Sequence, residues 1–122
     1  MIINHELVTR IKEHFNLNVY EAKVWLALLS KGVVSAGESA ELSGVPRSRT
    51  YDVLESLAKR GFAIVKVGKP VKYIAVDPKT VIEKMKTNTL SNAQEKVKVL
   101  TNLKETQEYK DLENLHNSGI SP

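Results

Sequence analysis

Two arginines stand two positions apart in the segment GVPRSRTYDVLESLAKRG, which spans residues 44–61. The planar guanidinium of arginine presents a fork of donors that matches a phosphate group and also the O6 and N7 edge of guanine. Nearby hydroxyl groups could add hydrogen bonds to the same kind of partner. The segment is therefore a candidate contact site for a nucleic acid, and we define its tip as Pro46, Arg47, Ser48, Arg49, Thr50 and Tyr51.

Two residues of this tip have a second interpretation. Thr50 equally suits the apolar side of a helix, because it precedes Val53, Leu54 and Leu57 at helical spacing. Tyr51 could bond a phosphate through its hydroxyl or pack its ring against a neighbouring element. The residue types alone leave both alternatives open.

Positive charge is concentrated around the tip. Residues 44–73 carry seven lysines and arginines against Asp52 and Glu55, for a net charge of +5, and the other residues sum to −1. A basic surface of this kind suits a polyanion, because neutralising phosphates releases condensed counterions. Charge alone is equally compatible with an ordinary solvated surface. The two acids would repel phosphates if the helix lay flat in a groove, so we expect the tip to enter first.

Three helices are predicted ahead of the helix that carries the tip. Apolar positions from Leu7 to Phe15 recur at three- and four-residue steps and indicate a first helix. Asn18 and Glu21 have the spacing of a capping box and begin a second helix, which is apolar almost all the way round. Trp25 is therefore expected in the core rather than on a ligand platform.

The third and fourth helices form a tight pair. Ser35 and Glu38 repeat the capping spacing before AGESAELS, and Gly44 is expected to end this helix in a left-handed conformation. Pro46 fits the first turn of the fourth helix, where its missing N–H costs nothing. Two helices joined by so short a turn predict a helix-turn-helix with the tip exposed.

A β-hairpin is predicted directly after the fourth helix. FAIVKV and VKYIAV are rich in β-branched and aromatic residues, and VGKP supplies the turn between them. A short strand at residues 33–34 could add a third edge. The predicted fold class is α+β, mainly α with a small β-hairpin, in the order of a winged helix-turn-helix. Phosphate contact and protection of an edge strand are both possible roles for the hairpin lysines Lys66, Lys69 and Lys72.

The rest of the chain is expected to be one long helix. Asp77 and Pro78 suit its start, and the pattern continues to about His116, although TNTLSN at residues 87–92 contains poor helix formers. We predict domains at residues 1–77, 78–117 and 118–122, the last a disordered tail. Such a helix could fold back on its own domain; we favour homodimerisation, because it is longer than that domain needs. Its expected dimer contacts, the seam, are Leu90, Ala93, Val97, Leu100 and Leu103.

Composition and motifs exclude several other classes of protein. The chain is 42% hydrophobic and 26% charged, with no apolar run near the ~18 residues that cross a bilayer and no signal peptide, so we expect a cytoplasmic protein without membrane contact. It contains no cysteine, which excludes disulfides and thiolate chemistry. No phosphate-loop, dinucleotide or nucleophile motif is present, and His5 and His14 lack metal-ligand spacing. We expect neither an enzyme, nor a cofactor, nor a metal site.

The segments YEAKVWLALLSKG, SGVPRSRTYDVLESLAKRGF and GKPVKY resemble the N-terminal winged-helix domain of the TrmB-like transcriptional regulators, a largely archaeal family. The resemblance covers residues 17–78. It implies a DNA-binding domain that acts as a homodimer, with the tip in the major groove and the hairpin on the backbone. Larger members carry a sugar-binding domain after the long helix, and a small-molecule effector is left unassigned here.

We therefore expect a sequence-specific regulator that binds an inverted-repeat operator in double-stranded DNA. The alternative is a winged helix used as a protein-docking or chromatin-associated module without sequence-specific operator binding. Docking modules usually replace the basic tip and hairpin with apolar or acidic residues, whereas both are basic here. This favours DNA as the partner.

Overall fold

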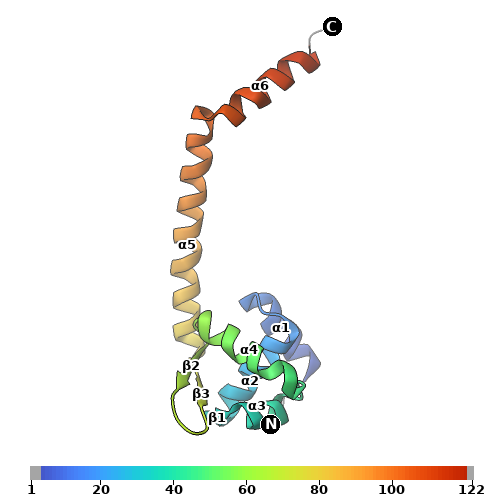
Figure 1. Cartoon of the computed structure of the whole chain (residues 1–122), viewed down its shortest axis with the longest axis vertical. Helices are drawn as coiled ribbons and strands as arrows, with labels where there is room; N and C mark the ends of the chain where they lie inside the picture. Colours follow the sequence, from blue (N-terminus) through green and yellow to red (C-terminus); the bar gives the residue numbers. More distant parts are fainter. Residues whose placement is uncertain (1–3, 121–122) are drawn as a thin grey trace. The chain divides into compact units, whose positions relative to one another are not determined.

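The computed structural model describes residues 4–120 and divides the chain into two compact units, residues 1–81 and 82–122. The first unit contains the predicted helices and hairpin, together with a third strand (Figure 1). Its elements are α1 (His5–Phe15), α2 (Val19–Lys31), β1 (Val33–Ser35), α3 (Ala36–Ser43), α4 (Arg47–Lys59), β2 (Ala63–Lys66), β3 (Lys72–Ala75) and the first turn of α5 (Pro78–Asn102). The predicted fold class, a winged helix-turn-helix that is mainly α, is confirmed.

Side chains fix the starts of α2 and α3 as the sequence predicts. The Asn18 Oδ1 accepts a hydrogen bond from the Glu21 N–H at 2.8 Å, and the Glu21 Oε1 accepts one from the Asn18 N–H at 2.9 Å. Ser35 and Glu38 form the same reciprocal pair at the start of α3. Gly44 ends α3 with φ 74°, a left-handed conformation that favours glycine. Local chemistry therefore fixes where α2 and α3 begin and where α3 ends, and the end of α3 sets where α4 can begin.

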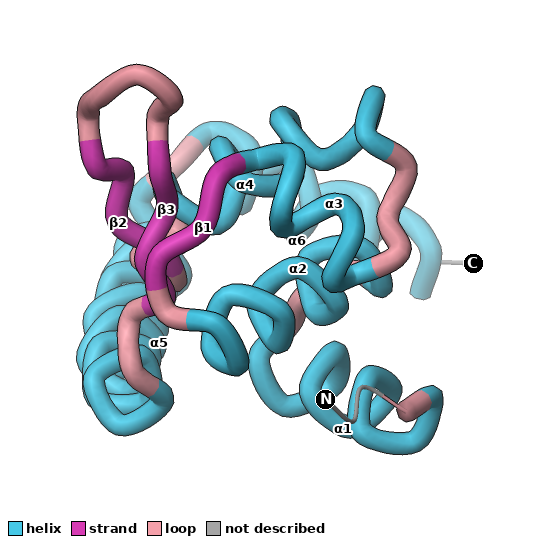
Figure 2. The backbone as a smooth tube through the Cα atoms, turned by 90° about the horizontal axis from the view of Figure 1, so that it is seen from below, coloured by secondary structure: helices cyan, strands magenta, loops and turns pink. Residues whose placement is uncertain are grey.

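The sheet has three antiparallel strands in the order β1-β3-β2. Figure 2 shows β3 between its two neighbours and the loop of the hairpin extending beyond them. Ile74 of β3 stands opposite Val33 of β1 and Ile64 of β2, which fixes the register on both sides. We call residues 63–75, which comprise β2, β3 and their connecting loop, the wing.

The core fixes α4 against α2. Trp25, Leu28, Leu54 and Leu57 are almost completely buried, so the prediction that Trp25 belongs to the core is confirmed. The Trp25 ring meets Phe15 edge to face with centroids 4.9 Å apart, an arrangement that adds to the hydrophobic gain of burying large side chains. The helix that carries the tip is therefore rigidly seated.

An ion pair between a buried carboxylate and a partly exposed arginine adds a second connection between α4 and the N-terminal helices. Glu21 is 5% exposed, and its carboxylate accepts hydrogen bonds from the Ser56 hydroxyl at 2.6 Å and from the Arg60 guanidinium at 3.3 Å. Arg60 also donates to the Asn16 carbonyl at 2.8 Å. Arg60 therefore joins α4 to the turn between α1 and α2 and is not a free surface cation.

The second unit departs from the predicted single helix. α5 runs through the poor helix formers of residues 87–92 and ends at Asn102; a 3-10 turn, Leu103–Glu105, separates it from α6, Gln107–Ile120. Figure 1 shows the chain changing direction at this interruption. Thr106 adopts an extended conformation, and its hydroxyl accepts a hydrogen bond from the Tyr109 N–H at 3.2 Å. The threonine thus caps a new helix instead of continuing the old one.

The boundaries of the predicted domains shift in two places. The first turn of α5 belongs to the first unit, because Val81 is buried there at 2% exposure. α6 continues to Ile120, so residues 118–120 are helical and not part of a disordered tail. Residues 121–122 lie outside the described part of the chain.

Candidate nucleic-acid interface

The tip lies at the N-terminal end of α4, directly after the turn from α3. Pro46 occupies the position before the helix, with φ −53° and ψ 135°, and α4 begins at Arg47, one residue later than expected. No side chain within residues 4–120 caps this end of the helix. The free N–H groups and the helix dipole therefore give the tip a partial positive charge.

Thr50 does not belong to the contact surface. Its side chain is completely buried, and its hydroxyl donates to the Pro46 carbonyl at 3.0 Å. Val53, Leu54 and Leu57 are buried on the same stripe of α4. Of the two interpretations of Thr50, a contact residue or a residue on the apolar side of the helix, the second is correct. The apolar stripe turns Thr50 inward, and the Pro46 carbonyl accepts a hydrogen bond from its hydroxyl.

Arg47 and Arg49 are both exposed, but they have different neighbours. The guanidinium of Arg47 lies over Gly37 of α3, where a Cβ would be only 3.4 Å from Nη2 and 3.6 Å from Cζ. The Cζ of Arg49 lies 5.6 Å from the ring centroid of Tyr20 on α2. Two positions along an α-helix correspond to about 200° of rotation, so the arginines leave α4 in different directions.

A groove lies between the tip and the wing. It encloses about 430 Å³ and is lined by residues of α3, α4 and the wing, including Gly37, Arg47, Tyr51, Pro70 and Tyr73. Tyr51 is 53% exposed and lines this groove together with the wing residues. We call this groove between the tip and the wing the wing-side groove.

A second groove lies on the other side of α4. It encloses about 600 Å³ between α1, α2 and α4, and its lining includes Lys12, Tyr20, Glu21, Arg49 and Asp52. Positive and negative side chains are balanced here, whereas the wing-side groove has arginine and tyrosine but no carboxylate in its lining among residues 4–120. We call this second one the α2-side groove.

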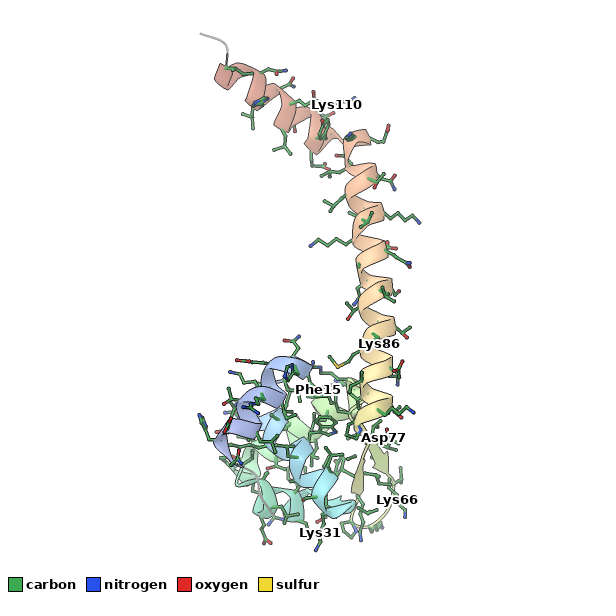
Figure 3. The ribbon with its side chains drawn as sticks, turned by 180° about the vertical axis from the view of Figure 1, so that it is seen from behind. Phe15, Lys31, Lys66, Asp77, Lys86 and Lys110 are labelled. Atoms are coloured by element: carbon green, nitrogen blue, oxygen red, sulfur yellow. The ribbon has the colours of Figure 1, made fainter. Side chains whose placement is uncertain are left out.

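The wing presents its lysines in a concentrated arrangement. Lys66 and Lys69 are exposed, and Lys72 is half-buried. Lys66 stands directly opposite Lys72 on the neighbouring strand, and Figure 3 shows Lys66 on the hairpin. Like charges opposite each other destabilise a strand pair, so a bound anion would relieve the repulsion.

Other charges near the tip and wing are already engaged. The backbone N–H and the hydroxyl of Ser35 lower the pKa of Glu38, and the positive charges of Lys72 and Lys31 add to this effect. Lys59 pairs with Glu55 at 3.5 Å, and both side chains are mostly exposed. Of the seven cations in residues 44–73, only those of the tip and wing are therefore candidates for an external partner.

The proposed dimer seam lies on α5 and the following turn. Leu90, Val97 and Leu100 are 66%, 61% and 55% exposed, Ala93 is also exposed, and Leu103 is half-buried in the 3-10 turn. Leu112 and Leu115 of α6 are exposed as well. The single chain thus leaves apolar side chains uncovered on both helices of the second unit.

Two kinds of site are not found in the described part of the chain. Residues 4–120 hold no cluster of three or more potential metal ligands. None of the helices in this range is both long and apolar enough to span a bilayer.

Sequence reasoning identified the exposed tip and wing but missed Gly37 and Tyr20. Gly37 carries no signal of its own, because it stands inside the short helix α3 and its role depends on a residue from the next helix. Tyr20 lies in the first turn of α2, where the apolar pattern predicts that an aromatic residue belongs to the core. Its half-buried ring is available only because α4 passes beside it.

These features define the class of protein: a winged helix-turn-helix domain whose exposed helix tip and wing are both basic. Residues 11–79, more than half of the chain, match the family model described as "Sugar-specific transcriptional regulator TrmB". The chain belongs to the TrmB family. This confirms the resemblance seen in the sequence.

The matching relatives are longer proteins. The DNA-binding HTH-type transcriptional repressor TrmBL2 of Thermococcus kodakarensis is 44% identical over 97 residues, which cover 80% of this chain and 35% of the relative. The HTH-type sugar sensing transcriptional regulator TrmBL1 of Pyrococcus furiosus is 35% identical over 75% of this chain and 26% of its own length. A solved structure of TrmBL2, described as an archaeal chromatin protein with a novel mode of DNA binding, has a TM-score of 0.80 and 38% identity over 96% of this chain and 46% of that chain. The chain thus spans about a third of the length of the repressor.

Proposed function

We propose that the protein binds double-stranded DNA as a transcriptional regulator, with the tip of α4 in the major groove and the wing on the phosphate backbone. One observation carries this proposal: Arg47 and Arg49 are exposed beside the uncapped N-terminal end of α4. Guanidinium groups and a helix N-terminus both favour negative charge at this place. The names of the relatives, a DNA-binding repressor and a sugar-sensing regulator, support the same function.

The second part of the proposal is that two copies act together on a specific operator. The exposed seam on α5 supports a homodimer, because burying its apolar side chains against a second copy removes them from water. Two winged helices related by a two-fold axis would contact two half-sites in successive major grooves. The operator is then an inverted repeat with centres about 10 bp apart, or a multiple of that distance.

A chromatin-associated role is the second candidate, and two observations favour it. The solved structure of TrmBL2 is described as that of a chromatin protein. In addition, Lys66, Lys69 and Lys72 on the wing suit phosphate contacts, which carry no sequence information. A protein that relied on such contacts would coat DNA with little preference for sequence.

A selection from random duplexes separates these candidates. Duplexes bound by the full chain at physiological salt would be recovered, amplified and sequenced over several rounds. Enrichment of an inverted repeat supports the specific dimeric regulator. Recovery of DNA without an enriched sequence supports the chromatin-associated role, and failure to bind any duplex at low salt overturns DNA binding altogether.

A further inference from the structure

The two arginines of the tip have different chemical surroundings, which suggests that they do different work. Arg47 lines the wing-side groove with the phenol rings of Tyr51 and Tyr73. These side chains offer positive charge or hydrogen-bond donors to an anion, and no carboxylate lines the groove among the described residues. Lys72 stands between the lining residues Val71 and Tyr73 in the chain, and its charge also acts on Glu38. A phosphate group fits this combination.

Gly37 lies next to the guanidinium of Arg47 in the wing-side groove. The guanidinium of Arg47 lies directly over the first turn of α3, with Nη2 3.4 Å from where a Cβ at position 37 would be, so there is room for a methyl group but not for a larger side chain. This placement keeps the arginine between the tip and the wing. Any branched side chain at position 37 would occupy the space of the guanidinium and push it out of the groove.

Arg49 has less positive surroundings than Arg47. It shares the α2-side groove with Lys12 and with the carboxylates of Asp52 and Glu21, and Glu21 is already paired with Arg60. The ring of Tyr20 supports its guanidinium from one side, which restricts its motion without using its donors. Balanced charges favour a phosphate less than the wing-side groove does, whereas a base edge carries no net charge and depends less on the surrounding potential. A restrained guanidinium is also well prepared for bidentate contact with guanine.

We infer that a phosphate of the bound DNA occupies the wing-side groove, where Arg47 contacts it, and that Arg49 contacts a base edge. This inference rests on the proposed function, because it assigns parts of the same DNA-binding surface. The sequence leaves both phosphate contact and base contact open for each arginine. The inference assigns one of these contacts to each. Gly37 is then a positioning residue for the phosphate contact.

The salt dependence of binding to a random duplex tests the assignment of the arginines. Neutralising one phosphate contributes about 0.9 to the slope of log affinity against log salt, so Arg47→Ala should reduce the slope by about that amount. Arg49→Ala should leave it unchanged. On the duplex enriched by selection, Arg49→Ala should cost about 5- to 150-fold in affinity. Arg47→Lys should retain much of the phosphate contact, whereas Arg49→Lys should not restore bidentate contact.

Gly37→Val tests the positioning role. It should reproduce the loss of slope seen in Arg47→Ala, and it should have little further effect when combined with Arg47→Ala, because the contact is already gone. Gly37→Ala, whose single methyl makes an ordinary contact with the guanidinium, serves as the milder variant. Thermal unfolding of each variant shows whether the first unit stays folded.

The outcomes separate this inference from the proposed function. If the unmodified chain binds no duplex, the proposed function fails. If it binds DNA, equal changes of slope for Arg47→Ala and Arg49→Ala overturn the division of labour, as does a slope that changes only with Arg49. An effect of Gly37→Val that persists undiminished without Arg47 overturns the positioning role alone.

Discussion

The guanidinium carbon of Arg49 lies 5.6 Å from the centre of the Tyr20 ring, so the first turn of α2 supports a residue at the tip of α4. Tyr20 is half-buried, and its position follows from the capping box of Asn18 and Glu21, which begins α2 in the same turn. A cation over an aromatic face gains about 0.5–1 kcal/mol at an exposed site. The ring thus restricts a long side chain that would otherwise sample many rotamers.

Replacing Tyr20 with alanine should weaken DNA binding by about 2- to 5-fold, because it removes this support of about 0.5–1 kcal/mol. Tyr20→Phe should bind like the unmodified chain, since it keeps the ring and loses only the hydroxyl. Fluorescence anisotropy with a labelled duplex measures both affinities. A loss as large for phenylalanine as for alanine would assign the effect to the hydroxyl and not to the ring.

The buried carboxylate of Glu21 should contribute substantially to folding. Glu21→Gln removes the charge that holds Ser56 and Arg60, and we expect the free energy of unfolding to fall by about 1–3 kcal/mol. Urea denaturation measures this difference. Glu55→Gln is the matched control, because its ion pair with Lys59 is mostly exposed and should be worth little. Equal effects of the two substitutions would contradict a special role for the buried carboxylate of Glu21.

The contribution of Glu21 should also depend on pH in a defined direction. Burial alone would raise the pKa of this carboxyl, but hydrogen bonds from the Asn18 N–H and the Ser56 hydroxyl, together with Arg60, lower it below its ordinary value of 4.5. A lowered pKa in the folded state adds stability that is fully present well above pH 4.5 and is lost as the pH falls through the folded value.

The free-energy difference between the unmodified chain and Glu21→Gln should therefore be constant from pH 7 to about 5.5 and shrink at lower pH. Subtracting the variant cancels the contributions of Glu38 and Asp77, whose pKa values are also lowered. Urea denaturation across this range provides the measurement. A difference that grows on acidification would mean that the folded state binds the proton on Glu21 more tightly than the unfolded state.

The wing lysines should act on all DNA sequences alike. Lys69→Ala is expected to weaken binding to the selected and to a random duplex by the same factor, and to reduce the salt slope by about 0.9. Lys59→Ala is the control, because this lysine lies at the far end of α4 beside Glu55. Titrations at several salt concentrations give the slopes. A loss confined to the selected duplex would show that Lys69 contacts a base.

The starts of the helices could be predicted from the sequence because capping is local. Asn18 and Glu21, like Ser35 and Glu38, are three residues apart, and each pair forms its two hydrogen bonds within one turn. The interruption after α5 was missed because it depends on Thr106, and threonine has no distinct pattern within a helix of mixed composition. The poor helix formers of residues 87–92 cost too little per residue to break α5.

The candidate site could be predicted only in part, for a related reason. Periodicity placed the tip on the exposed end of α4, yet it left the role of Thr50 open, and burial in the structure decided that question. The pairs Arg47–Gly37 and Arg49–Tyr20 join residues from different helices. So does Glu21–Arg60, whose members are 39 positions apart. Packing of the helices brings these residues together, and no local pattern encodes it.

The seam on α5 offers a direct test of the proposed homodimer. Val97 and Leu100 are 61% and 55% exposed in the single chain, and helical spacing places them on the same side as Leu90. Two glutamates in their place would bring four like charges to the interface of a dimer related by two-fold symmetry. Such charges cannot be buried without partners, so the copies should separate.

The double substitution Val97→Glu and Leu100→Glu should give a chain of monomeric mass that retains its helical content and its folded first unit. Affinity for a duplex with two half-sites should fall by roughly 10² or more, because each copy then binds without the effective concentration that the dimer provides. Affinity for a single half-site should be unchanged. Sedimentation equilibrium gives the mass, circular dichroism the helical content, and anisotropy the two affinities.

Ser91→Glu together with Asn102→Glu is the matched control, because it adds the same charge to the opposite side of α5. This variant should remain dimeric and bind the two-site duplex normally, since its charges stay in water. If the seam variant also stays dimeric and binds normally, the copies do not meet through the seam. The exposed Leu112 and Leu115 of α6 would then be the next residues to substitute, because they are the other large apolar side chains that the second unit leaves uncovered in the described part of the chain.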